Sequence, residues 1–211
     1  MATARVRFTR PAEELREMSV SAPAYPFALD VDPPEKQSRL TVFFRLIMLI
    51  PHAIILEFLL VAAYVVMILV WFAILITGKL PGGLGNFVLG SLHWLTRYGG
   101  YAWLLTGKYP PFALGEDSNY PVRLSGEVQT EGRSRVTVFF RMLMIIPHVI
   151  VLYFLNIALS VVVLISWIVA LFTGSVPAGL HGFIAGFLRW QTRLGAYAML
   201  LTDQYPPFSK S

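Results

Sequence analysis

Residues 46–76 read LIMLIPHAIILEFLLVAAYVVMILVWFAILI, a run of 31 residues in which Glu57 is the only Asp, Glu, Lys or Arg. A membrane-spanning helix needs about 20 apolar residues, with a range of about 17–25. The run therefore indicates a membrane segment and is too long for one straight span. Pro51 lies near its start, and proline is well tolerated in a first helical turn and poorly inside a helix. We therefore predict a short interfacial helix over residues 38–50 and a first span over residues 52–76.

The same pattern returns 96 residues later without a gap. The matches include RLTVFFR at 39–45 with RVTVFFR at 135–141, IPH at 50–52 with 146–148, TG at 77–78 with 173–174, and YPPF at 109–112 with 205–208. So many matches at one offset indicate a duplicated domain rather than the shorter units of a solenoid. The chain is divided into an N-terminal arm (1–24), a first membrane unit (25–114) and a second membrane unit (115–211).

A second apolar segment follows the first in each copy. In the first copy it covers residues 84–106, where Asn86, His93 and Arg97 fall on one helical face. Such a segment either spans the membrane with its polar stripe turned inward or lies in the membrane plane. We favour spanning, because the length fits and the stripe is narrow. The expected fold is an all-α integral membrane protein with one interfacial helix and two spans per unit, four spans in total.

The distribution of basic residues orients these spans. The connectors 78–83 and 174–181 contain one Lys between them, whereas the N-terminal arm, the middle connector and the C-terminus hold nearly all the others. The positive-inside rule then places both termini in the cytoplasm and the protein in the cell membrane as a multi-pass protein. The two units would run in the same direction, related by a pseudo-twofold axis along the membrane normal.

The polar segments before each unit are rich in Pro, Gly and charge. Residues 27–31 and 122–124 have the composition of short strands, and a strand pair across the duplicated units is compatible with them. These segments are expected on the cytoplasmic side.

Composition narrows the classes of function. Apolar and aromatic residues make up 56% of the chain and charged residues 14%, against about 25% charged in a typical soluble domain. The net charge of +5 lies beside apolar runs, which favours anionic lipid headgroups over nucleic acid as partners. The chain has no cysteine, which excludes disulfides and thiolate chemistry.

The combined motifs resemble a bacterial domain-of-unknown-function family of small membrane proteins, common in actinobacteria and often present in tandem. In chain order they are Tyr-Pro, Arg, Ile-Pro-His, a Trp-containing span ending in Thr-Gly, Arg/His-Trp-x-x-Arg and Tyr-Pro-Pro-Phe, and they cover residues 25–208. The resemblance implies a membrane location and supports the duplication, and it implies no reaction. The copies depart from one pattern at His93, matched by Arg189, and at Glu57, matched by Tyr153.

Several arginines are candidates for binding an anionic ligand or lipid headgroup. Arg97, Arg193 and Arg189 lie inside apolar segments, where a charge costs about 2.5–3.5 kcal/mol on insertion scales. Arg45 lies in the predicted interfacial helix of the first unit, Arg141 is its counterpart in the second, and both would reach toward headgroups. The alternative is that these arginines snorkel to the interface or cap carbonyl groups within their own unit.

His52 and His148 follow proline at equivalent places in the two copies. Paired histidines on two helices can ligate haem or a metal, but the chain lacks the clustered ligands of strong metal sites. We therefore expect them to bind the backbone or a headgroup, and we predict no metal and no cofactor.

Glu57 lies in the first span and has no acidic counterpart in the second copy. It would form an intramembrane ion pair with Arg45, Arg97 or Arg193, or carry protons. The ion pair is favoured, because a proton relay normally needs several carboxyl groups within the membrane.

No catalytic constellation is recognisable: there is no Walker A loop, GxSxG, HExxH or GxGxxG with a following acid. We therefore predict a non-enzymatic membrane protein, an accessory or scaffold subunit that binds lipids and protein partners in a larger complex or homo-oligomer. The alternative is a small oligomeric transporter or channel lined by the intramembrane Arg and Glu. A membrane enzyme acting on lipid through the two histidines is a third hypothesis.

Overall fold

The apolar run at the start of each copy forms one long helix. In the computed structural model, which describes residues 25–210 and so excludes the predicted N-terminal arm, α3 covers Arg45–Thr77 and α6 covers Arg141–Thr173. Each helix ends at a glycine in the left-handed conformation, Gly78 with φ +73° and Gly174 with φ +78°. Glycine adopts this conformation without steric cost, so the ends predicted from the Thr-Gly pairs are confirmed.

The predicted break at Pro51 is wrong. Helix α3 continues through this proline, which lies in the second turn and removes one backbone hydrogen bond there. The interruption lies instead at Phe44, whose φ of −87° and ψ of 7° separate α3 from the short helix α2 (Arg39–Phe43). In the second copy α5 (Arg135–Phe139) precedes α6 in the same way. The expected interfacial helix is therefore reduced to five residues.

These short helices are exchanged between the copies, since α2 packs against α6 and α5 packs against α3. Trp167 Nε1, near the end of α6, donates to the carbonyl of Val42 in α2 at 3.0 Å. Trp71 Nε1 of α3 donates to the carbonyl of Val138 in α5 at 3.2 Å. The start of each long helix thus lies beside the end of the other, and α3 and α6 run in opposite directions. The prediction that both units run in the same direction is therefore wrong.

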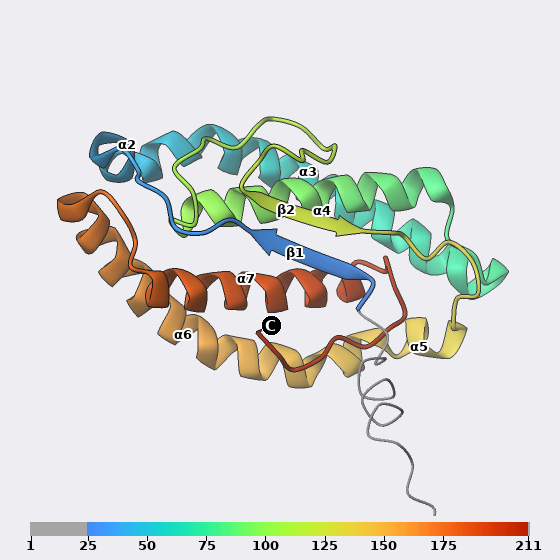
Figure 1. The fold of residues 1–211 in the computed structure, drawn as a ribbon. Coiled ribbons are helices and arrows are strands. Elements are labelled where there is room, and N and C mark those ends of the chain that lie inside the picture. Colours follow the sequence, from blue (N-terminus) through green and yellow to red (C-terminus); the bar gives the residue numbers. More distant parts are fainter. Residues whose placement is uncertain (1–24, 211) are drawn as a thin grey trace, which may run out of the picture.

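The second helix of each copy lies in the interior, α4 over Gly82–Ala102 and α7 over Ala178–Ala198. Twelve of the 21 residues of α4 are buried, including His93 and Arg97. The two helices lie side by side at the centre, each packed against the long helix of its own copy (Figure 1). Among the described helices, only α3 and α6 are long and apolar enough to cross a membrane. The structure thus has two candidate spans where the sequence predicted four.

Two short strands join the copies in an antiparallel pair. β1 (Phe27–Val31) pairs with β2 (Val122–Gly126), and Asp30 lies opposite Arg123 in the register. Arg123 forms ion pairs with Asp30 and, at 2.6 Å, with Asp32. The predicted strands and their pairing across the duplicated units are confirmed. β1 packs on α7 and β2 on α4, so each strand covers the central helix of the other copy.

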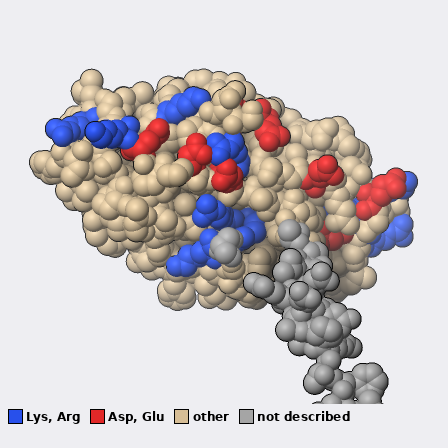
Figure 2. All heavy atoms as spheres, in the orientation of Figure 1, with Lys and Arg blue, Asp and Glu red and all other residues tan. Residues whose placement is uncertain are grey.

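The molecule has a charged face and an apolar periphery. Lys, Arg, Asp and Glu side chains are spread over the face that carries the strand pair (Figure 2). The outer faces of α3 and α6 instead expose large apolar side chains, among them Phe58 at 74%, Phe154 at 65% and Phe172 at 75%. Burial of the apolar face of a helix is the usual source of its stability in water, so these faces need another environment.

Candidate functional site

Arg45 begins α3 and turns inward, where its guanidinium caps the C-terminal end of α4. Nη1 donates to the carbonyls of Tyr101 at 2.5 Å and Thr106 at 3.1 Å. The guanidinium carbon lies 4.3 Å from the centre of the Tyr101 ring. Arg45 is only 2% exposed. The last carbonyls of a helix lack intrahelical partners and carry partial negative charge, so this buried cation stabilises the helix end.

Arg141 caps α7 in the same way, with Nη1 donating to the carbonyls of Tyr197 at 2.5 Å and Thr202 at 2.8 Å. Both capped ends turn through a leucine in the left-handed region, Leu104 and Leu200, each with φ +65°. A branched side chain rarely adopts positive φ, because its Cβ approaches the backbone. The arginine hydrogen bonds thus hold both chain reversals in a conformation that leucine disfavours.

The partner of the second guanidinium nitrogen differs between the copies. Gln37 Oε1 accepts from Arg45 Nη2 at 2.6 Å. In the second copy, Asp203 Oδ1 accepts from Arg141 Nη2 at 2.5 Å and from Arg133 Nη2 at 2.7 Å. Burial acts to raise the pKa of Asp203, but the hydrogen bonds from Arg133 and from the backbone N–H of Ser134, together with the charges of both arginines, outweigh it and hold that pKa below its usual range. We call the first group the Gln37 node and the second the Asp203 node.

His52 is enclosed by aromatic rings. Its Nδ1 accepts from Trp94 Nε1 at 2.9 Å, and the Phe112 ring stacks on it with 3.9 Å between centroids. Because Nδ1 accepts, the neutral ring carries its proton on Nε2. His148 repeats this arrangement in the second copy, at 2.9 Å and 3.8 Å, and both histidines are completely buried. Residues 25–210 contain no group of three metal-ligating side chains, so the haem or metal alternative gains no support from the structure.

Arg97 and Arg193 bind the residues that follow the Tyr-Pro-Pro-Phe segments. Arg97 donates to the carbonyl of Gly115 at 2.7 Å and to that of Ala113. Arg193 donates to the carbonyl of Ser209 at 2.5 Å. Both arginines are thus directed at the chain segment that leaves their own unit, which is the capping alternative considered for them.

Arg189 and Glu57 occur in one copy only. Arg189 Nε donates to the carbonyl of Leu29 in β1 at 3.1 Å. Glu57 is exposed on the outer face of α3 and takes part in none of the ion pairs formed among residues 25–210. The predicted intramembrane pair is therefore not formed within this part of the chain. A ligand role stays a prediction for the seven candidate residues, each of which has an intramolecular partner: Arg45, Arg141, Arg97, Arg193, Arg189, His52 and His148.

Two matching grooves lie where the copies exchange their short helices. One, of about 440 Å³, is lined by Leu104 and Trp167. The other, of about 450 Å³, is lined by Leu200 and Trp71. Both linings are mainly apolar, which suits hydrocarbon rather than a polar substrate.

The fold and these contacts define a class: a pseudo-symmetric helical protein of two interlocked copies, with two peripheral helices of membrane-spanning length. The sequence matches the family described as Domain of unknown function (DUF4389) twice, over residues 39–113 and 135–210. The chain therefore belongs to this family, and the predicted tandem of a domain of unknown function is confirmed. Searches of curated proteins and of solved structures gave no match.

The sequence did not lead to the residues that form hydrogen bonds with the candidate side chains. The bond from Trp94 to His52 was foreseeable, because both copies place this tryptophan 42 residues after its histidine. Asp203 is the single acidic residue after residue 135, so its pairing with a buried arginine was foreseeable too. The role of Gln37 as a partner of Arg45 was not foreseeable, because the matching position in the second copy holds Arg133.

Proposed function

We propose that this protein is a non-enzymatic accessory or scaffold subunit of a larger membrane complex, embedded through the outer faces of α3 and α6. The observation that supports this proposal is the series of large exposed apolar side chains along the outer face of each of those two helices. Removing apolar surface from water contributes about 25 cal/mol per Å², so a surface of this extent favours cover by lipid or by another protein.

In this proposal the charged strand face points toward water, and the long helices lie along one leaflet of the membrane. In a transmembrane arrangement, antiparallel α3 and α6 would bring β2 across the bilayer beside α4. Asp30 and Asp32, with side chains 69% and 46% exposed, would then lie at membrane depth, where exposed charges and open sheet edges are costly. Helix α3 is also about 50 Å long at 1.5 Å per residue, against a hydrocarbon core of about 30 Å.

Both ends of the described chain favour this placement. Tyr25 Oη donates to the carbonyl of Arg193, and Arg193 donates to the carbonyl of Ser209, so the two ends approach the same part of α7. Under this placement, Tyr25 and Ser209 lie on the same side of the membrane. The basic residues of the strand face and the N-terminal arm make the cytoplasmic side the expected one.

Glu57 favours a protein partner on α3. Its carboxylate is exposed among apolar side chains and has no ion pair among residues 25–210. A lone carboxylate facing lipid is costly, whereas a cationic side chain of another subunit would neutralise it. Tyr153 occupies the matching position of α6. We therefore place the partner on the α3 side and lipid on the α6 side.

The alternative function, an oligomeric transporter or channel, has less support. Arg97 and Arg193 are directed at backbone carbonyls rather than at a path, and Glu57 lies on the outer face of a different helix. The hypothesis of a lipid-processing enzyme needs accessible histidines, and His52 and His148 are buried against tryptophan.

Cysteine accessibility tests the placement, because the native chain has no cysteine. Single variants Lys79→Cys and Ser175→Cys in the helix connectors, and Lys108→Cys near the strand face, are treated with a membrane-impermeant maleimide in intact cells and in inverted vesicles. The proposed placement predicts labelling of all three from the cytoplasmic side. Labelling of Lys79→Cys from outside, with Lys108→Cys labelled from inside, would instead establish transmembrane helices.

Co-purification tests the accessory role. The native protein, extracted from its host in mild detergent, is expected to carry a larger membrane complex with it. Glu57→Lys is expected to release that complex, while Tyr153→Lys, the matched change on α6, retains it. A strictly monomeric protein without partners, or equal loss in both variants, would contradict a partner on α3.

A further inference from the structure

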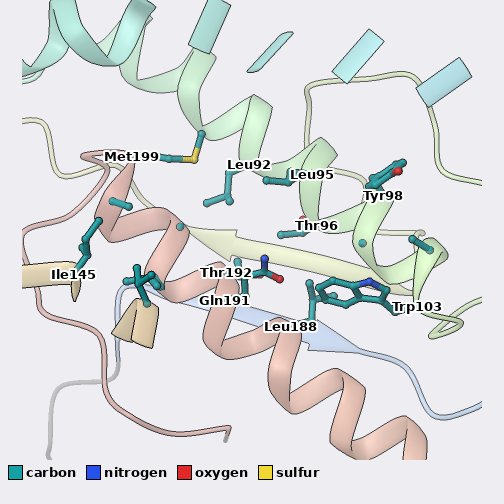
Figure 3. Close-up of a pocket in the computed structure, with 16 residues that line it drawn as sticks. Leu92, Leu95, Thr96, Tyr98, Trp103, Ile145, Leu188, Gln191, Thr192 and Met199 are labelled. Carbon is teal, nitrogen blue, oxygen red and sulfur yellow. The ribbon is translucent and has the colours of Figure 1, made fainter. Parts of the chain in front are cut away.

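Two arginines project from α7 on the side that the strand pair covers. Leu188 and Gln191 of α7 point toward α4 across a cavity of about 360 Å³, and β1 and β2 lie behind both helices (Figure 3). Arg189 and Arg193 are not part of that lining. Arg189 Nε instead donates to the carbonyl of Leu29 in β1 at 3.1 Å. Arg193 lies four residues further along α7 and therefore on the same face of the helix.

Lys210 adds a third positive charge over this face. Its Nζ lies 4.5 Å from the centre of the Phe183 ring of α7. Its backbone packs on Gly186, where a Cβ would lie 2.9 Å from the Lys210 Cβ. Burial lowers the pKa of Arg193, and the positive charge of Arg189 lowers it further. Neither Arg189 nor Lys210 forms an ion pair within residues 25–210. We call Arg189, Arg193 and Lys210 the α7 basic cluster.

The first copy has carboxylates at the corresponding place. Its α4 carries His93 and Arg97 at the positions that match the two arginines of α7. Burial lowers the pKa of Arg97, and the negative charge of Asp117 opposes this shift. Burial and the charge of Arg97 lower the pKa of His93, and Glu116 opposes them. Both carboxylates belong to the loop 113–119, which comes directly before the residues leading into β2. The segment that precedes the strand thus brings negative charge to the helix that the strand covers.

The pseudo-symmetry gives the N-terminal arm the place of this loop in the second copy. β1 begins 95 residues before β2 and packs on α7 as β2 packs on α4. The residues that precede β1 are therefore the counterpart of the loop 113–119. Tyr25 Oη donates to the carbonyl of Arg193 at 3.0 Å, so the arm joins the described chain beside the α7 basic cluster.

The arm, which lies outside the described residues, contains the acidic sequence that such a counterpart needs. Residues 13–17 read EELRE, with three glutamates and one arginine. Glu17 is eight residues from Tyr25, and an extended chain of that length spans up to about 29 Å. Arg189 is only about 6 Å along α7 from Arg193. The glutamates can therefore reach every member of the cluster.

We propose that the glutamates of residues 13–17 bind the α7 basic cluster and hold the N-terminal arm against the strand side of α7. Arg189 is half-buried and Lys210 is exposed, so both cationic groups are accessible to a carboxylate. Carboxylates accept strong charge-assisted hydrogen bonds from guanidinium and ammonium groups. Exposed ion pairs contribute little one by one, but a short tether raises the effective concentration of the glutamates to about millimolar. While the arm is bound, the cluster is closed to other anions.

Distances between spin labels test this contact, because the native chain has no cysteine. One label is attached to Ala12→Cys, beside the glutamates, and the other to Gly182→Cys on α7, where a side chain meets no neighbour within 4 Å. The full chain is measured in detergent by double electron–electron resonance. We expect one narrow distribution of distances between the two labels.

Charge reversal identifies the residues that hold the arm. Arg189→Glu with Lys210→Glu should broaden the distribution about twofold, because a tethered segment without its contact samples many positions. Lys36→Glu with Lys108→Glu makes the same change in net charge outside the cluster and should leave the distribution unchanged. Lys210→Glu alone keeps the bond from Arg189 to β1 and should give a smaller broadening.

Reversal of both partners completes the test. Glu13→Lys, Glu14→Lys and Glu17→Lys, added to the variant with Arg189→Glu and Lys210→Glu, should restore the narrow distribution. Thermal unfolding shows whether each variant is folded. A broad distribution in the native chain, or no restoration by the double reversal, would overturn the proposal. Binding of added phosphatidylglycerol that depends on the cluster, with the arm distribution broad, would assign the cluster to lipid instead. These measurements in detergent do not depend on the membrane placement or on the partner at α3.

Discussion

The Gln37 node and the Asp203 node occupy the same place in the two copies and use different chemistry. Each holds an arginine that caps a central helix through two backbone carbonyls. Around this shared cap, the first copy supplies one neutral acceptor, and the second supplies a carboxylate bound by Arg133 and Arg141. Both copies thus keep the interaction with the backbone, while the side-chain partner has changed. The cap is the common requirement, and its partner is replaceable as long as the guanidinium remains satisfied.

The two nodes should also differ in how strongly the loss of one side-chain partner destabilises the protein. The Asp203 node contains two arginine side chains that are 0% and 1% exposed and share one carboxylate. The Gln37 node contains a single buried charge. Removal of one partner from a buried ion pair is strongly destabilising, because an uncompensated charge stays behind, whereas loss of a neutral acceptor costs less.

The largest expected effect is that of Asp203→Ala. It leaves two buried guanidinium groups without a carboxylate and should lower the free energy of unfolding by about 3–5 kcal/mol. Gln37→Ala removes the hydrogen bond from the charged Arg45, which contributes about 1.5–3 kcal/mol, and a neutral hydrogen bond to the carbonyl of Leu104, which contributes about 0.5–1.5 kcal/mol. Thermal unfolding in mild detergent measures both, at about 2–4 °C per kcal/mol for a chain of this size. Equal losses in the two variants would show that the carboxylate adds nothing beyond an acceptor.

A smaller effect is expected from pH, and only at the Asp203 node. The pKa of Asp203 in the folded protein is below its ordinary value of 3.8, so the unfolded chain takes up the proton first as pH falls. The stabilisation is complete above about pH 3.8 and is lost as pH falls through the lower folded value. The unfolding midpoint should therefore drop on acidification below that pH. Asp203→Asn should flatten this part of the profile, and an unchanged profile would contradict the assignment.

The sequence indicated the elements well because each has a local cause. The apolar run predicts α3 and α6, the Thr-Gly pairs predict where they end, and the polar segments predict both strands. The misplaced break at Pro51 has a local cause as well, since the helix tolerates one missing hydrogen bond in its second turn.

The packing of the helices and strands against one another has no comparable local cause in the sequence. The motifs at 39–45 and 135–141 are nearly identical, so either short helix fits either long helix, and the sequence does not distinguish packing within a copy from exchange between copies. The segment of α4 is long enough to span and carries one charge, which favoured a span, and only the structure shows that β2 and α7 cover it. The recurring arginines and histidines were found by their recurrence, whereas their hydrogen-bond partners lie 8 to 62 residues away in the sequence.

The smallest expected effect concerns the tryptophan–histidine hydrogen bond that both copies share. Trp94→Phe and Trp190→Phe each remove the indole N–H that His52 or His148 accepts at 2.9 Å, and keep an aromatic ring in the same place. A neutral hydrogen bond contributes about 0.5–1.5 kcal/mol, so each variant should lower the unfolding midpoint slightly and by a similar amount. The double variant should show the sum, because distant sites without shared partners are additive. A loss in one copy only would mean that the histidine sites have diverged as the arginine nodes have, and that recurrence in the sequence does not guarantee an equal role.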